Sequence, residues 1–143
     1  MKRGKDYVGV AVVTLCHDGK GNYLLGQRSD KCRDEHFRWD LIGSGGVDVG
    51  ETLNEAVERE VKEESGAGVT AIEFLGYREV FRDMEEGKTH YIVFDYKVEI
   101  IRERVINTEP EKCLEIGWFT IDHLPEPMHS QWPAFFEQHK DKL

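Results

Sequence analysis

Glu60, Glu63 and Glu64 are spaced by three and four residues in the segment EREVKEESG, where a helix is expected. Side chains at this spacing project from one side of an α-helix. The same side carries an apolar stripe, and such stripes face the core of a domain. The stripe consists of Leu53, Ala56, Val57 and Val61. Glu60 and Glu64 fall within the stripe and Glu63 lies at its edge, so the pattern directs carboxylates toward the protein body.

Carboxylates in this position must be neutralised. Burying one unpaired carboxylate costs several kcal/mol, and like charges side by side add to that cost. Divalent cations with oxygen ligands meet this need. The helix face therefore predicts a metal site built from the three glutamates.

The helix is expected to begin after Thr52 and to end near Ser65-Gly66. Thr52 and Glu55 have the spacing of a capping box, and glycine is a common residue at a helix end. The turn before the helix is rich in glycine and contains Gly45 and Gly50. These glycines allow the backbone to turn sharply and to approach a ligand closely.

Alternating apolar residues and turn residues predict six strands around this helix. They cover residues 7–15, 23–28, 39–42, 69–82, 89–101 and 114–120, and the first two are expected to form a hairpin. A second helix is expected near the C-terminus, where an aromatic stripe for packing repeats at helical spacing. Its residues are Trp132, Phe135, Phe136 and His139, with Pro133 in the first turn. The sum is an α+β fold, an α/β/α sandwich whose mixed sheet has one helix on each face.

The 143 residues suit one domain over 1–143, and no apolar run approaches the ~20 residues of a membrane span. A net charge of −9 argues against a nucleic acid polymer as partner but permits a small phosphorylated ligand bridged by metal. The three widely spaced cysteines, Cys16, Cys32 and Cys113, are typical of reduced thiols, so we expect a cytoplasmic protein. Monomer and homodimer both remain open.

The region around the glutamates resembles the signature of the Nudix hydrolases. The matching residues are Gly45, then Glu51 after five residues, then Arg59-Glu60-Val61-Lys62-Glu63-Glu64-Ser65-Gly66-Ala67 after seven. The match spans residues 45–67, and the Trp39-Asp40 pair and the order of elements extend the likeness over most of the chain. Two departures are Ser44, where many members have glycine, and Ala67, a weak closing hydrophobe.

The resemblance implies a Nudix-type fold and Mg²⁺ as cofactor, with Mn²⁺ as a substitute. It makes Glu60, Glu63 and Glu64 the metal ligands and catalytic residues, with the backbone carbonyl of Ser44 as a further ligand. The bound metal would bridge phosphate oxygens and lower the pKa of a water that attacks phosphorus.

The resemblance also makes Arg59 and Glu51 a supporting pair, whose fork would hold the loop against the helix. A surface arginine is the alternative reading for Arg59. Gly45, Gly50 and Gly66 are the glycines that support this arrangement.

The general base is open between a glutamate of the helix and a carboxylate of a later loop. Glu111, in Glu109-Pro110-Glu111-Lys112, is the first candidate outside the helix and Glu115 is the second. A solvated acidic loop explains either residue equally well.

Residues expected to contact substrate lie between the second and third strands. Arg28 is placed where family members often have a phosphate-contacting base, and the loop after it adds Lys31, Arg33 and Arg38. This basic loop in an acidic chain suits the entrance of a phosphate. Phe37 and Trp39 could stack on a nucleobase, although core packing is the stronger expectation for Trp39.

The function favoured by these residues is hydrolysis of a nucleoside diphosphate linked to a group X. A nucleoside triphosphate or a modified one is the first choice, giving a monophosphate and pyrophosphate. A nucleotide-sugar hydrolase is the alternative, because Lys88-Thr89-His90-Tyr91 has some likeness to that group. A non-catalytic module that senses a nucleotide ranks lower, because such modules typically lose glutamates that this chain keeps.

Overall fold

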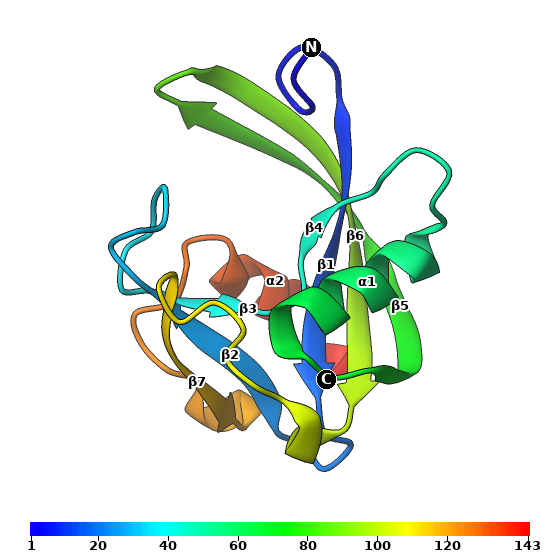
Figure 1. Ribbon diagram of the computed structural model, residues 1–143, viewed down its shortest axis with the longest axis vertical. Helices are drawn as coiled ribbons and strands as arrows, with labels where there is room; N and C mark the ends of the chain where they lie inside the picture. Colours follow the sequence, from blue (N-terminus) through cyan, green and yellow to red (C-terminus); the bar gives the residue numbers. More distant parts are fainter.

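A mixed β-sheet of seven strands is the centre of the computed structural model, which describes residues 1–143 (Figure 1). The elements are β1 (Gly9–His17), β2 (Tyr23–Arg28), β3 (Trp39–Leu41), β4 (Gly45–Gly46), α1 (Leu53–Ser65), β5 (Val69–Met84), β6 (Gly87–Ile100), β7 (Cys113–Phe119) and α2 (Trp132–His139). Three short 3₁₀ helices cover Arg102–Arg104, Ile121–His123 and Lys140–Lys142. None of the helices combines the length and apolar character needed to cross a bilayer. The expected α+β fold is confirmed.

Strand β1 is the middle of the sheet, whose order is β3-β2-β1-β6-β5. It pairs in parallel with β6 along its whole length, from Gly9 opposite Tyr91 to His17 opposite Glu99. On its other side it pairs with β4 at Ala11 and Val12.

The expected hairpin of the first two strands forms only at its turn, where His17 pairs with Tyr23. Strand β4 takes the same edge of β1 further along, at Ala11 and Val12. Strand β2 instead pairs with β3 and β7. The first strand also begins and ends two residues later than the apolar pattern indicated.

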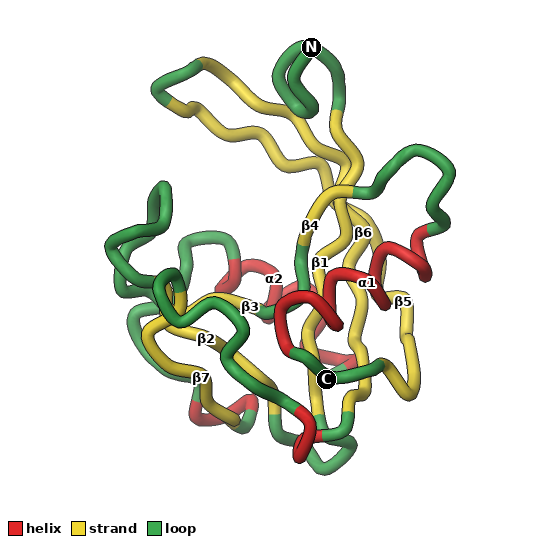
Figure 2. The backbone as a smooth tube through the Cα atoms, viewed as in Figure 1, coloured by secondary structure: helices red, strands yellow, loops and turns green.

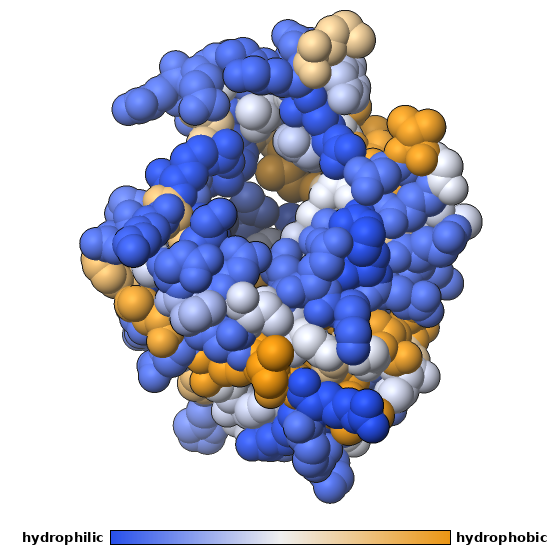
Figure 3. All heavy atoms as spheres, viewed as in Figure 1, coloured by the Kyte–Doolittle hydropathy of each residue, from blue (hydrophilic) through white to orange (hydrophobic).

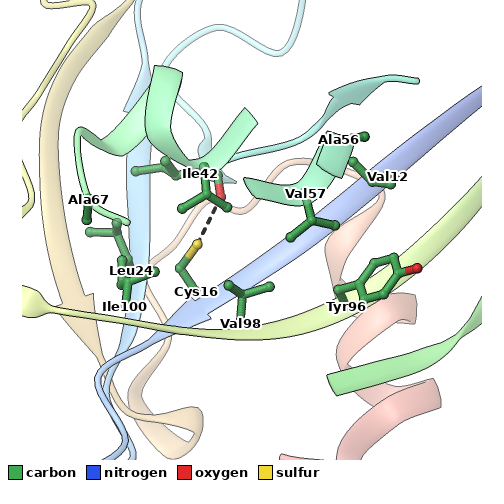
Figure 4. Packing of buried hydrophobic residues seen from close by; sticks show 11 residues of the cluster. Val12, Cys16, Leu24, Ile42, Ala56, Val57, Ala67, Tyr96, Val98 and Ile100 are labelled. Carbon is green, nitrogen blue, oxygen red and sulfur yellow. Dashed lines mark hydrogen bonds between the residues drawn. The ribbon is translucent and has the colours of Figure 1, made fainter. Parts of the chain in front are cut away.

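The two helices cover opposite faces of the sheet (Figure 2). Under α1, the stripe residues Ala56, Val57 and Val61 are fully buried among side chains of β1, β2 and β6, as Figure 4 shows for Ala56 and Val57. Under α2, the packed residues are Trp132, Phe135, Phe136, Val13, Leu15 and Val93. Burial of both apolar stripes stabilises the sandwich and confirms that the aromatic stripe of α2 serves packing.

A buried ion network attaches α2 to the sheet. Asp95 of β6 is fully buried and accepts two hydrogen bonds from the Arg78 guanidinium, from Nε at 2.7 Å and from Nη2 at 2.8 Å. His139 Nε2 lies 2.9 Å from Asp95 Oδ2. Arg78 also lies over the rings of Trp132 and Phe135, so its charge is shared between a carboxylate and two aromatic faces.

Both ends of α1 are fixed as the sequence predicts. Glu55 N donates to Thr52 Oγ1 and Thr52 N donates to Glu55 Oε1, each at 3.1 Å, which completes the capping box. Gly66 ends the helix with a φ of 77°, and its N–H donates to the Lys62 carbonyl at 3.0 Å. A helix fixed at both ends holds its glutamates in a defined position relative to the sheet.

Candidate active site

Glu64 lies in the wall of a cavity of about 190 Å³. The other walls come from β2, β3 and the loop before β7, which contribute Arg28, Asp40 and Glu109 among others. Gly43 N donates to Glu64 Oε1 at 2.9 Å. Gly43 has a φ of 100°, and a Cβ at this position would lie 2.5 Å from Thr14 Oγ1. Glycine is therefore required where the turn meets the helix.

The surroundings of Glu64 oppose its negative charge. Burial raises the pKa of the Glu64 carboxyl to about 8, against the hydrogen bond from Gly43 N–H, which lowers it. The carboxylates of Glu60 and Asp40 raise the pKa further. A cation bound here would stabilise the charged form of Glu64.

Glu60 lies against the turn that precedes α1. Its side chain is 12% exposed, and a Cβ added at Gly45 would collide with its carboxylate. Glu63 is placed differently, because its side chain is 58% exposed at the rim. The structure thus brings Glu60 and Glu64 together on the inward side of α1 and leaves Glu63 at the edge, in the order that the helical pattern predicts.

The candidate metal ligands at this site suit a hard divalent cation, because all of them are oxygen atoms and the glutamates carry negative charge. No group of three His, Cys, Asp or Glu side chains is already arranged to hold a metal ion. Ser44 lies between the two glycines that contact the glutamates, and its hydroxyl accepts a hydrogen bond from Thr14 N at 3.3 Å. Because the Ser44 hydroxyl is bound to β1, the backbone carbonyl of Ser44 is the group that could act as a metal ligand, as the sequence predicts.

Arg59 joins the turn to the helix. Its guanidinium donates to both oxygens of Glu51, from Nε at 2.7 Å and from Nη2 at 2.9 Å. Nη2 also donates to the Gly46 carbonyl at 2.9 Å, and Nη1 donates to Glu60 Oε1 at 2.7 Å. The two hydrogen bonds from Arg59, and one from the backbone N–H of Asp48, lower the pKa of Glu51 to about 2. With 29% of its side chain exposed, Arg59 is neither fully buried nor a free surface residue.

Arg28 lines the cavity, but other protein groups occupy its guanidinium. Nη1 donates to Asp40 Oδ2 at 2.9 Å, Nη2 donates to Asp34 Oδ1 at 3.0 Å, and Nε donates to the Asp34 carbonyl at 3.1 Å. Asp40 also accepts from Trp132 Nε1 at 2.6 Å. Asp34 and Asp40 therefore neutralise the positive charge of Arg28, which we expected to contact a phosphate of the substrate. Sequence reasoning missed both roles, because only the fold brings these carboxylates to Arg28.

The other substrate contacts expected from sequence lie outside the cavity wall. Arg38 pairs with Glu35 at 3.3 Å and donates to the Met128 carbonyl at 3.0 Å. Phe37 is half exposed and adopts a φ of 64°. Trp39 is buried and packs edge-on against Phe119, as its core alternative predicts.

The loop before β7 places a different carboxylate in the cavity than the one selected from sequence. All three carboxylates of this region are exposed, but Glu109 lines the cavity and Glu111 and Glu115 do not. The Glu109 carbonyl accepts hydrogen bonds from Lys112 N and Cys113 N, so the chain turns here. The Glu111 carbonyl accepts from Ser29 Oγ at 2.6 Å. This turn places Glu109 at the cavity, and no motif or spacing in this loop indicates that choice.

Comparison with known proteins gives one family. The model of the NUDIX domain matches residues 7–138. The chain is similar to the structure of a MutT Nudix hydrolase from Burkholderia pseudomallei, with 27% identity, a TM-score of 0.77 and coverage of 92% of this chain and 98% of that one. A MutT protein from Methanosarcina mazei Go1 has 27% identity, a TM-score of 0.69 and 94% coverage of each chain. A Nudix hydrolase from Nitrosomonas europaea shares the fold at 22% identity, a TM-score of 0.70 and coverage of 95% and 88%.

The contact between Arg59 and Glu51 can be tested by a double-mutant cycle in the metal-free protein. Arg59→Ala and Glu51→Ala should each lower the free energy of unfolding in urea, because each leaves the other group without its partner. The double variant should lose less than the sum of the two losses. The exposed pair Lys140 and Glu137 is the control, and its cycle should be additive. Additive losses at Arg59 and Glu51 would show that the fork is absent in solution.

Proposed function

The chain belongs to the Nudix family of hydrolases, and from that premise we propose that it is a Mg²⁺-dependent nucleotide pyrophosphohydrolase. The proposed substrate is a nucleoside triphosphate or a modified one, and the proposed products are the nucleoside monophosphate and pyrophosphate. The family typically depends on divalent metals and acts on small nucleotide-type substrates.

One observation carries the proposal. Glu60 and Glu64 are held against the backbone of Gly43 to Gly45 beside a cavity, and Glu64 has no cationic side chain paired with it. A fold gains no stability from this arrangement, because burial and mutual repulsion both oppose it. Such an unfavourable cluster is expected where a bound cation and an anionic substrate complete the site.

We propose that Glu60, Glu63, Glu64 and the Ser44 carbonyl hold the cation. When bound, the cation supplies neutralisation of phosphate oxygens and activation of water. Arg59 positions Glu60 through the hydrogen bond at 2.7 Å and ties it to the turn through Glu51 and Gly46. Asp40 accepts a hydrogen bond from the indole of Trp132 and orients Arg28, which lines the cavity.

The proton of the attacking water needs an acceptor that lines the cavity. Glu64 meets this condition, because it lines the cavity. Of the loop carboxylates, we propose Glu109 in place of Glu111 as the alternative base, since Glu109 lines the cavity and Glu111 does not.

Glu64→Gln tests the metal face. The turnover number with saturating Mg²⁺ should fall on the order of 10³-fold or more, because the amide removes a negative ligand. The thermal midpoint in EDTA should stay level or rise, because a buried charge and its repulsion with Glu60 are removed. Glu58→Gln, on the exposed outer side of α1, is the control and should change neither value. Turnover near that of the unmodified protein would contradict the assignment.

The bond that breaks can be identified by hydrolysis in ¹⁸O-labelled water with mass spectrometry of the products. A nucleoside triphosphate should yield the monophosphate and pyrophosphate as first products, with one ¹⁸O atom in one of them. Orthophosphate as the first product from a triphosphate would refute the proposed reaction. Inertness toward every triphosphate combined with turnover of a nucleotide sugar would support the alternative substrate class.

A further inference from the structure

A second hollow of about 330 Å³ lies between the N-terminal residues, the β5–β6 hairpin and the loop that follows β2. Figure 3 shows the recess below the N-terminal end of the chain. Its lining includes the cationic side chains Lys2, Arg3, Lys5, Arg33 and Arg82, against one carboxylate, Glu86. The chain as a whole carries a net charge of −9, so this surface is opposite in sign to the rest.

Three of these cations are without an internal partner. Arg3 pairs with Asp48 at 3.2 Å and Arg82 pairs with Asp34 at 2.7 Å. The side chains of Lys2, Lys5 and Arg33 take part in no ion pair or hydrogen bond, although carboxylates outnumber cations in the chain. Unpaired cations gathered around one hollow attract an anion.

The N-terminal residues are held in place by β6. His90 N donates to the Gly4 carbonyl at 2.7 Å, and Tyr91 Oη donates to the Arg3 carbonyl at 3.2 Å. A Cβ at Gly4 would collide with the Tyr91 ring, so the turn lies directly on that side chain. Lys2 and Lys5 therefore project from a fixed turn instead of a free tail.

The hollow adjoins the candidate active site on two sides. On one side, Asp34 bridges Arg82 of the hollow at 2.7 Å and Arg28 of the first cavity at 3.0 Å. On the other side, the Arg3 guanidinium lies against Gly46, whose carbonyl accepts a hydrogen bond from Arg59, the residue that holds Glu60. These contacts connect the hollow to the loop after β2 and to the turn before α1, both of which border the candidate site.

We propose that this hollow binds a phosphate group of the substrate beyond the diphosphate linkage that is positioned at α1. Lys2, Lys5 and Arg33 supply the free charge for it. Arg28 and Arg38, which the sequence predicts to contact phosphate, already form ion pairs. Arg28 pairs with Asp34 and Asp40, and Arg38 pairs with Glu35. The inference rests on the proposed function and deepens it, because the hollow favours substrates with three or more phosphates over nucleoside diphosphates joined to a neutral sugar.

The test removes the three free charges together in the variant Lys2→Gln, Lys5→Gln, Arg33→Gln. The control variant Lys20→Gln, Arg104→Gln, Lys140→Gln makes the same change in net charge at exposed residues that line neither cavity. For both variants, kcat/KM is measured at fixed ionic strength for nucleoside triphosphates and for nucleotide sugars with the same bases. Binding of inorganic tripolyphosphate in EDTA is measured by calorimetry and does not depend on catalysis.

The hollow variant should lose about tenfold in kcat/KM for triphosphates, mainly through KM, and change less than about twofold for nucleotide sugars. Its affinity for tripolyphosphate should also fall about tenfold, and the control variant should match the unmodified protein in every assay. Equal losses in both variants, or unchanged values in the hollow variant, would overturn the inference. If the unmodified protein hydrolyses no nucleotide, the proposed function fails, and the tripolyphosphate measurement alone decides whether the hollow binds phosphate.

Discussion

The constraint on which this structure depends is the placement of carboxylates on the inward face of α1. Glu60 and Glu64 interrupt an apolar stripe that the fold must bury, so the surrounding backbone has to approach them closely. Gly43 provides a hydrogen bond to Glu64 and Gly45 provides space for Glu60. Arg59 pairs with Glu51 and Glu60 but not with Glu64, and burial raises the pKa of Glu64 to about 8. The remaining imbalance is what a divalent cation would relieve.

Around this helix the molecule separates its charges. Carboxylates of α1 and β3 line the first cavity together with Lys112, while three unpaired cations gather at the hollow between the N-terminal residues and the β5–β6 hairpin. Asp34, bound by Arg28 and Arg82, lies between the two regions. This arrangement suits the proposed chemistry. Phosphates bridged by the metal would be held through carboxylates, whereas a phosphate without metal would need cationic side chains.

Features set by local chemistry could be predicted from the sequence. The capping box, the left-handed Gly66 and the burial of the α1 stripe depend on residues a few positions apart, and all three are confirmed. Features set by chain topology could not. The parallel pairing of β1 with β6, the occupation of Arg28 by Asp34 and Asp40, and the choice of Glu109 over Glu111 at the cavity each depend on distant segments. The basic hollow likewise combines residues from four separate stretches of chain.

The central claim, that the inward glutamates of α1 form a divalent metal site, is tested most directly by a crystal structure with Mn²⁺, located by its anomalous scattering. We predict a peak within about 2.5 Å of carboxylate oxygens of Glu60 and Glu64, and its absence in crystals of the Glu64→Gln variant. A peak bound only elsewhere on the chain, or no peak at millimolar Mn²⁺, would contradict the account.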